Sequence, residues 1–326
     1  MESTPMHRHH LSLYAIARSA VGGFFWVTLS WLYLAAVPAN AAELVRHTVT
    51  IDDHAFAIWE KSPPKAQHAV MLVHGRTWSS LPDFDLNTAN ADLSLMNALA
   101  AAGIAAYAID MRGYGDTPRD ATGWLTPNRA AADLIGAMQW LNDRLEKTSG
   151  SGSRAHLFGW SYGSMIAQLA LQQSQQLATG LILFGYPIRR GITKEPPNSD
   201  GAAPARANTK TNAASDFITP GSIDQDAIDE FVQRALEADP IRTDWRELRQ
   251  WRALDGRNIR TPTLLLQGEF DPLAKRRAHK RLMRRLNTDD KQWVVIKQGD
   301  HAAFMEPNLG ARAQFLSVLT GFIKTH

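Results

Sequence analysis

The chain of 326 residues contains no cysteine. It therefore has no disulfide, no thiolate nucleophile, and no cysteine ligand for zinc or an iron–sulfur cluster. Any catalysis must use other side chains, and nothing in the sequence calls for a metal or an organic cofactor. Cysteine usage also leaves the cellular compartment open, because the chain has no thiols whose redox state would indicate one.

The chain also lacks a strong excess of charge of either sign. It has 35 lysines and arginines against 32 aspartates and glutamates, a net charge of +3. So small a surplus does not provide the basic face that binds phosphate backbones, and we expect no nucleic-acid partner. The densest basic run, residues 275–285, fits the solvated face of one helix. With 44% hydrophobic and 21% charged residues, the composition is that of a globular protein.

Long hydrophobic runs are absent apart from residues 20–37, near the N-terminus. Arg8 and Arg18 precede this run, and small residues follow it up to Ala41. The order is typical of an export signal, so we predict that residues 1–41 are a signal peptide cleaved after Ala41 and that the mature protein is periplasmic or secreted. The alternative is an uncleaved membrane anchor, since the run approaches the ~20 residues that span a bilayer. Contact with a membrane is expected only through this segment.

The rest of the chain alternates between short apolar runs and amphipathic stretches. Residues 44–59 predict an antiparallel hairpin, and the later apolar runs predict strands separated by helices. These later strands are expected at residues 69–73, 104–109, 155–158, 181–184, 263–267 and 292–296. Strands that alternate with helices form a mostly parallel, doubly wound sheet with helices on both faces. We therefore predict an α/β core formed by residues 42–187 and 261–326.

The alternation is interrupted by an insertion, residues 188–260. Its first half is rich in small polar residues and predicts a flexible loop, whereas its second half predicts amphipathic helices at 224–238 and 243–254. Long insertions in compact α/β domains are usually functional or disordered, so we predict a helical cap or lid over a pocket. The alternative is that its apolar residues only pack on the sheet.

One motif carries chemistry by itself, the segment Gly159-Trp160-Ser161-Tyr162-Gly163 between a predicted strand and a predicted helix. It matches the G-x-S-x-G pattern, in which a sharp strand-to-helix turn holds the serine in strained geometry. Both glycines are needed because a β-carbon would crowd the neighbouring strand and helix. The serine hydroxyl then stands at the carboxyl edge of the sheet, beside the positive end of the following helix. Ser161 is therefore the candidate nucleophile.

A serine hydroxyl needs a base, and the base needs an acid to orient it. His301 follows the last predicted strand, and Asp271 follows the strand before it, so both lie at the same edge as Ser161. Glu269 and Asp300 are the competing acids. The other histidines considered as bases, His74, His156 and His279, are expected to be structural.

The chain order Ser161, Asp271, His301 resembles that of the α/β-hydrolase fold family. His74-Gly75 and the segment Asp110-Met-Arg-Gly-Tyr-Gly115 add to the resemblance, which extends from about residue 69 to the C-terminus. It implies an α/β-hydrolase fold with an inserted cap, although the insertion itself has no clear sequence match.

The resemblance also implies an oxyanion hole formed by the backbone N–H groups of Arg76 and Tyr162. The side chain of Arg76 either forms a buried ion pair or points into the pocket to bind an acidic substrate group. Trp78 and Trp160 are candidates for the acyl pocket, with core packing as the alternative.

From these residues we predict a serine hydrolase that cleaves a carboxylic ester or related acyl bond of a small-molecule substrate through a Ser-His-Asp triad and an acyl-enzyme, with the acyl size left open. An aspartate-nucleophile enzyme is disfavoured because the turn holds serine. An acyltransferase, an amidase or a perhydrolase would use the same residues, and a ligand-binding homologue without turnover is a further alternative. The sequence leaves the oligomeric state open.

Overall fold

A computed structural model describes residues 42–150, 152–188, 191–197 and 199–326. The predicted signal peptide or anchor, residues 1–41, lies outside the described residues, so its cleavage and the export of the protein stay predictions. Within the described ranges, no helix is both long and apolar enough to cross a bilayer.

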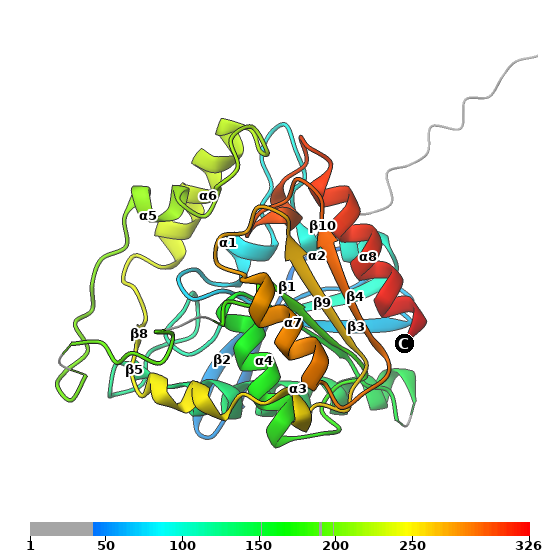
Figure 1. Ribbon diagram of the computed structural model, residues 1–326, viewed down its shortest axis with the longest axis horizontal. Helices are drawn as coiled ribbons and strands as arrows, with labels where there is room; N and C mark the ends of the chain where they lie inside the picture. The colour runs from blue at the N-terminus through cyan, green and yellow to red at the C-terminus, as the bar shows by residue number, and fades with distance from the viewer. Residues whose placement is uncertain (1–41, 151, 189–190, 198) are drawn as a thin grey trace, which may run out of the picture. The chain divides into compact units, whose positions relative to one another are not determined.

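An eight-stranded sheet forms the centre of the described chain, in the order β1-β2-β4-β3-β6-β7-β9-β10 (Figure 1). The strands β1 and β2 form the predicted hairpin, β2 is antiparallel to β4, and all other neighbours are parallel. The predicted mostly parallel sheet is thus confirmed. Its strands are β1 (Val45–Ile51), β2 (His54–Lys61), β3 (His68–Val73), β4 (Ile104–Ile109), β6 (His156–Trp160), β7 (Leu181–Phe184), β9 (Thr263–Gly268) and β10 (Lys291–Ile296).

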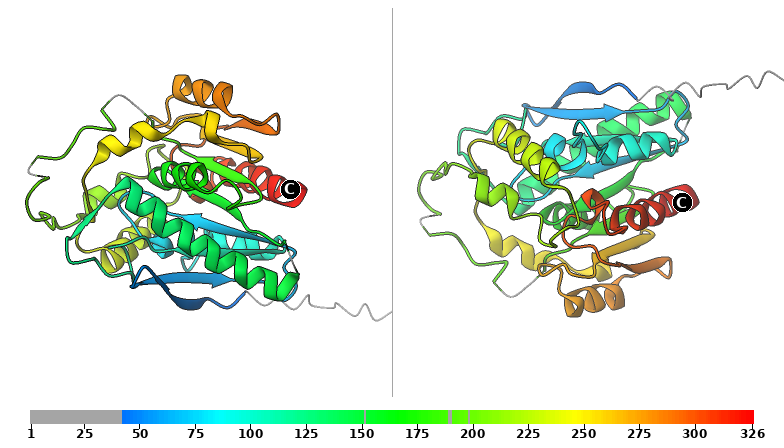
Figure 2. Two further views of the ribbon diagram at one scale, coloured as in Figure 1. Left: turned by 90° about the horizontal axis from the view of Figure 1, so that it is seen from below. Right: turned by 90° about the horizontal axis from the view of Figure 1, so that it is seen from above.

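Helices cover both faces of the sheet, as predicted (Figure 2). Side chains of successive strand residues point to opposite faces, so in β3 Met71 belongs to one hydrophobic core and Leu72 to the other. The first core contains side chains of three helices, α3 (Pro127–Ser149), α4 (Tyr162–Gln173) and α7 (Arg276–Arg285). The second contains side chains of α1 (Ser80–Phe84), α2 (Leu95–Ala101), α6 (Gln225–Ala238) and α8 (Ala311–Thr325).

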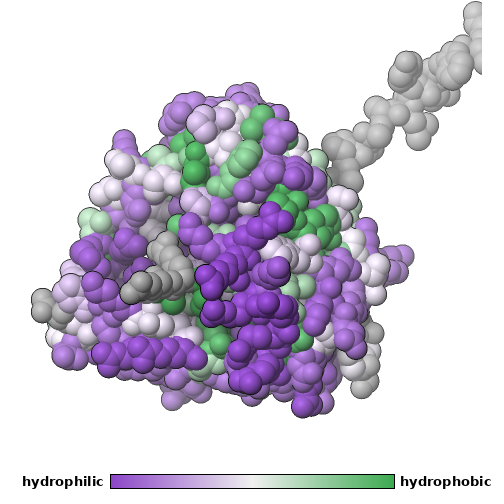
Figure 3. Space-filling model, in the orientation of Figure 1, coloured by the Kyte–Doolittle hydropathy of each residue, from purple (hydrophilic) through white to green (hydrophobic). Residues whose placement is uncertain are grey.

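The basic run at residues 275–285 forms α7, and its charged side chains face solvent. Only His279 and Leu282 of this helix are buried. In the space-filling view, strongly hydrophilic residues gather over the part of the surface where α7 lies (Figure 3). The predicted solvated helix face is confirmed.

The insertion contains one of the two predicted helices, α6, which corresponds to residues 224–238. The prediction of a helix over 243–254 is wrong. There β8 (Asp244–Trp245) pairs in parallel with β5 (Trp124–Leu125), and a short 3₁₀ helix, η1 (Leu248–Ala253), follows. Glu247, which lies between β8 and η1, has a φ of 55°, and an α-helix does not accommodate this angle. The three-residue and four-residue spacing of apolar residues reflects burial of Trp245 and Trp251 against Tyr162. The insertion also contains α5 (Lys210–Ala214) and η2 (Gly256–Asn258).

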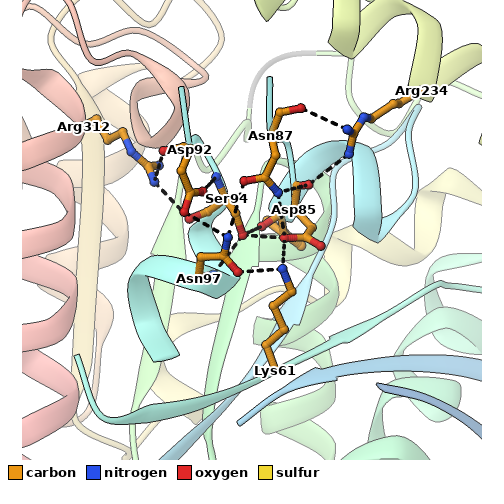
Figure 4. Close-up of polar contacts among 9 residues, drawn as sticks. Lys61, Asp85, Asn87, Asp92, Ser94, Asn97, Arg234 and Arg312 are labelled. Carbon is orange, nitrogen blue, oxygen red and sulfur yellow. Dashed lines mark hydrogen bonds and ion pairs between the residues drawn. The ribbon is translucent and has the colours of Figure 1, made fainter. Parts of the chain in front are cut away.

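A polar network attaches α6 to the core (Figure 4). Arg234 of α6 donates a hydrogen bond to the carbonyl oxygen of Asn87, 3.0 Å away, in the loop between α1 and α2. In the same loop Asp85 forms a buried ion pair with Lys61 of β2, at 2.7 Å, and accepts a hydrogen bond from Ser94, at 2.6 Å. A buried charge is stable only when it is paired and hydrogen-bonded. This network therefore fixes the loop on which α6 rests.

The turn between β6 and α4 contains the G-x-S-x-G motif in the predicted strained geometry. Ser161 has a φ of 54° and a ψ of −120°, and it directly precedes α4. A β-carbon on Gly159 would lie 2.3 Å from the carbonyl oxygen of Gly163, and one on Gly163 would lie 2.1 Å from the carbonyl oxygen of Val73. Both distances are far below van der Waals contact, so only glycine fits at either position.

We expect Gly163→Ala to destabilise the protein by about 3 kcal/mol or more, because the new methyl group meets backbone that cannot rotate away. Urea unfolding followed by tryptophan fluorescence measures this change. Gly321→Ala in α8 is the matched control, since a β-carbon added there would have no atom within 4 Å. That variant should be more stable than the wild type by about 0.5–1 kcal/mol. Equal stability of the two variants would contradict the steric explanation.

Candidate active site

Ser161 and His301 line one cavity of about 190 Å³. The cavity lies between the loop that follows β3, the β6–α4 turn and the insertion, which contributes Ile192, Asp216 and Arg242 to its wall. A larger groove of about 550 Å³ elsewhere on the protein contains neither Ser161 nor His301. The cavity of about 190 Å³ is therefore the one that two of the residues predicted from the sequence, Ser161 and His301, line together.

The turn at Ser161 contacts the backbone of two other segments, β7 and the loop that follows β3. Its N–H donates to the carbonyl oxygen of Phe184 in β7, at 2.9 Å, which ties the turn to the neighbouring strand. A β-carbon on Gly75 would lie 3.6 Å from the β-carbon of Ser161, so the loop after β3 is in contact with the serine. The partial positive charge at the start of α4 favours negative charge at this point.

His301 is held by Asp271. Its Nδ1 donates a hydrogen bond to Oδ2 of Asp271, at 2.8 Å, and both side chains are buried. The other carboxylate oxygen accepts from the N–H groups of Leu273, at 2.8 Å, and Ala274, at 3.1 Å. Burial alone would raise the pKa of Asp271, but the hydrogen bond and charge of His301 together with these N–H groups lower that pKa below its ordinary value. With Nδ1 protonated, the neutral imidazole has its lone pair on Nε2.

The two competing acids have other partners. Glu269 accepts hydrogen bonds from Lys297 Nζ and from the N–H of Gln298, both at 3.0 Å. Asp300 accepts from the N–H groups of Ile218, at 3.0 Å, and Thr219, at 2.6 Å, in the insertion. Asp271 is the one of the three that contacts the imidazole, whereas Asp300 connects the loop of His301 to the insertion.

Two glycines that sequence reasoning missed shape the surroundings of His301. Gly185, directly after β7, has a φ of 59°, and a β-carbon there would lie 2.8 Å from Cε1 of His301. A β-carbon on Gly268, at the end of β9, would lie 2.1 Å from the carbonyl oxygen of Asp300. These close approaches bring the loops of Asp271 and His301 together. The only sequence signal is a glycine at the end of a buried strand.

The loop after β3 is fixed by groups on both of its sides. The Nδ1–H of His74 donates to the carbonyl oxygen of Gly75, at 2.8 Å, and its Nε2 accepts from the N–H of Met111, at 3.0 Å. Burial lowers the pKa of His74 to about 4, so this histidine is neutral and structural. The hydroxyl of Tyr114 donates to the carbonyl oxygen of Arg76, which orients the peptide group next to the cavity.

Arg76 is one of the residues that line the cavity. Its guanidinium carbon lies 5.1 Å from the centre of the Tyr162 ring. None of the ion pairs formed within the described ranges includes Arg76. The ion-pair alternative for this side chain thus finds no partner among the described residues, and binding of an acidic substrate group stays a prediction.

Both predicted pocket tryptophans line the cavity, and each also makes a hydrogen bond. The indole N–H of Trp160 donates to the carbonyl oxygen of His301, at 2.6 Å, and thereby supports the histidine loop. The indole N–H of Trp78 donates to Oδ2 of Asp216, at 2.9 Å, and thereby fixes an acid of the insertion. Their packing and pocket roles are therefore not exclusive.

Three further charged residues line the cavity, Asp83, Asp216 and Arg242, and sequence reasoning missed all of them. The two residues of the insertion lie in no recognisable motif, so no local signal pointed to them. No cluster of three or more histidine, aspartate or glutamate side chains in the part of the chain that the structure describes could hold a metal ion.

Comparison with known proteins shows the family and the fold of the chain. A family model described as "Serine aminopeptidase, S33" matches residues 64–308. No curated protein sequence matches the chain significantly.

Solved structures with the same fold include three hydrolases of low sequence identity. E-2-(acetamidomethylene)succinate hydrolase is 20% identical with a TM-score of 0.61, and the match covers 86% of this chain and 100% of that one. A monoacylglycerol lipase from Paleococcus ferrophilus is 19% identical with a TM-score of 0.54, covering 87% and 99%. An alpha/beta hydrolase fold protein from Chitinophaga pinensis is 15% identical with a TM-score of 0.62, covering 88% and 99%.

The structural likenesses establish the fold, and the family match extends over most of the sequence, from β3 and its His-Gly loop to the loop that holds His301. The chain therefore belongs to the S33 serine aminopeptidase family of hydrolases with the α/β-hydrolase fold.

Proposed function

We propose that the protein is a serine hydrolase that cleaves a carboxylic ester of a small acyl compound, with Ser161, His301 and Asp271 as its catalytic triad. The observation that carries the proposal is the hydrogen bond from His301 Nδ1 to Asp271, beside a cavity that His301 shares with Ser161. This hydrogen bond leaves Nε2 as the basic nitrogen, as a general base for a serine requires.

In the proposed mechanism the hydroxyl oxygen of Ser161 attacks the acyl carbon of the ester while Nε2 of His301 takes the hydroxyl proton. The ionised carboxylate of Asp271 keeps the imidazole in one tautomer and stabilises the imidazolium that forms. His301 then gives the proton to the departing alcohol, which leaves an acyl group on Ser161. Water, activated by the same imidazole, releases the acid and restores the serine.

The developing oxyanion is assigned to two backbone N–H groups, those of Tyr162 and Arg76. Tyr162 is the first residue of α4, so its N–H has no acceptor within the helix. The loop of Arg76 is in contact with Ser161 through Gly75, and Tyr114 orients the peptide that follows. Preorganised donors of this kind are typically the largest single contribution to catalysis in acyl transfer.

Cleavage of an amide is the second candidate, because the description of the matching family model names an aminopeptidase. The ester is favoured by the names of other structural neighbours, among them a monoacylglycerol lipase and a membrane phospholipase A. The same triad serves both reactions, so the choice depends on the relative rates for an ester and an amide of the same acyl group.

The proposal predicts that a fluorophosphonate probe labels the full chain and that p-nitrophenyl acetate is hydrolysed. Ser161→Ala should abolish labelling and lower kcat by about 10⁴-fold or more, since the nucleophile is removed. Ser317→Ala, an exposed serine of α8, is the control and should behave as the wild type. A wild type that does not label refutes the proposal. Faster cleavage of acetanilides than of the matched phenyl acetates favours the amide.

The contact between Gly185 and His301 yields a second prediction. In Gly185→Ala the new methyl group would push the imidazole away from Ser161, and a displacement of about 1 Å lowers kcat by roughly 100-fold. Gly103→Ala is the matched control, because Gly103 has a φ of 84° but no atom within 4 Å of an added β-carbon. Both variants bear the strain of a positive φ, so both should lose stability, Gly185→Ala the more because of its contact with His301, while only Gly185→Ala loses activity. Equal kcat values for the two variants would rule out this positioning role.

A further inference from the structure

Two arginine side chains from different parts of the fold line the cavity that contains Ser161. Arg76 follows β3 in the core, and Arg242 lies between α6 and β8 in the insertion. Burial, and then the nearby charge of Arg76, lower the pKa of Arg242 below its ordinary value. A guanidinium nevertheless stays protonated in proteins. The cavity wall therefore holds two cations that are close enough to repel each other.

Carboxylates act on Arg242 only beyond ion-pair distance: the charge of Asp244 raises its pKa, and Arg242 in turn lowers the pKa of Asp216. No ion pair within the described ranges includes Arg76 or Arg242. The Nε of Arg76 is buried and has no hydrogen-bond partner, and its guanidinium stacks over the ring of Tyr162. Both arginines are only partly exposed. A partly buried charge without a counter-ion is unfavourable, so an anion bound between these side chains would gain from both.

The acids of the cavity do not cancel this charge. Burial, together with the charge of Asp216, raises the pKa of Asp83 well above its ordinary value, which disfavours the ionised form of this acid. Burial raises the pKa of Asp216 to about 6 against the charge of His301 and the hydrogen bond from Trp78, so Asp216 is mostly ionised. Asp216, whose Oδ2 already accepts a hydrogen bond from an indole N–H, is therefore the main counter-charge to the two arginines of the cavity wall.

From this arrangement we infer that the natural substrate carries a carboxylate a few atoms from its scissile ester, and that Arg76 and Arg242 bind this carboxylate. The inference rests on the proposed function, since it concerns the cavity of Ser161. A planar guanidinium matches the two oxygens of a carboxylate and forms charge-assisted hydrogen bonds with them. The same cations repel the free ammonium group of a peptide N-terminus, which counts against an aminopeptidase substrate.

The size of the cavity limits the substrate further. Its volume of about 190 Å³ is below the ~300–1,000 Å³ of typical small-molecule sites. A cavity of this size favours an acyl group of a few carbons over a long lipid chain. The substrate class that fits both the size and the charge is the monoester of a short dicarboxylic acid.

Monoethyl succinate and ethyl levulinate test this inference, because the second replaces one carboxylate oxygen of the first by a methyl group. We expect kcat/KM for monoethyl succinate to exceed that for ethyl levulinate by about 10-fold or more at low salt, as charge-assisted hydrogen bonds imply. Product formation is followed by chromatography with the full chain, and fluorophosphonate labelling of Ser161 is measured in parallel. The preference should decrease when sodium chloride is added.

Variants of Arg242 connect the preference to this cavity. Arg242→Met should reduce the succinate-to-levulinate ratio towards one, and Arg242→Lys, which keeps the charge, should retain part of it. Arg252→Met is the control, since Arg252 is exposed on η1 and does not line the cavity. Arg242 is chosen over Arg76 because the backbone of Arg76 belongs to the proposed oxyanion hole.

The possible outcomes separate the inference from the proposed function. A preference for monoethyl succinate that depends on Arg242 supports the inference. If the wild type labels with the probe but prefers ethyl levulinate, turns over neither ester, or keeps its preference in Arg242→Met, the inference is wrong and the serine hydrolase proposal stands. If Ser161 does not label at all, the proposed function fails and the inference fails with it.

Discussion

The close approach of α4 to the end of β3 is the constraint on which the candidate site depends. The backbone at Gly163 lies so near the carbonyl oxygen of Val73 that no side chain fits between them. This contact forces the sharp turn that gives Ser161 its positive φ and holds its side chain at the start of α4. Strain of this kind persists only where the surrounding structure imposes it, and here the two packed strands β3 and β6 do so.

The second part of the site depends on backbone approaches of the same kind. Gly268 lets the loop of Asp271 lie against the backbone of Asp300, and Gly185 leaves room for the ring of His301. The indole of Trp160 in the serine turn then donates to the carbonyl oxygen of His301. The segments that hold Ser161, His301 and Asp271 are therefore connected by direct contacts.

The insertion adds two ionisable side chains to the wall of the cavity. Asp300 binds two N–H groups of the insertion, and α6 rests on the polar network around Asp85. These contacts bring Asp216 and Arg242 to the cavity wall. The core thus supplies the groups proposed for bond cleavage together with Arg76, and the insertion supplies Arg242, the second arginine proposed for substrate recognition. This division is common in folds that support many substrates on one set of catalytic residues.

The sequence by itself determined the α/β core and the serine turn, because buried strands and glycine-bounded turns are local patterns with local physical causes. It also determined the order of Ser161, Asp271 and His301. Only the tertiary structure decided that Asp271 contacts the imidazole while Asp300 does not, and that the segment after α6 forms β8 and η1 instead of a helix. It likewise brought Arg242 beside Arg76. Such contacts are between residues far apart in the chain. They depend on how the elements pack, and no periodic pattern in the sequence indicates them.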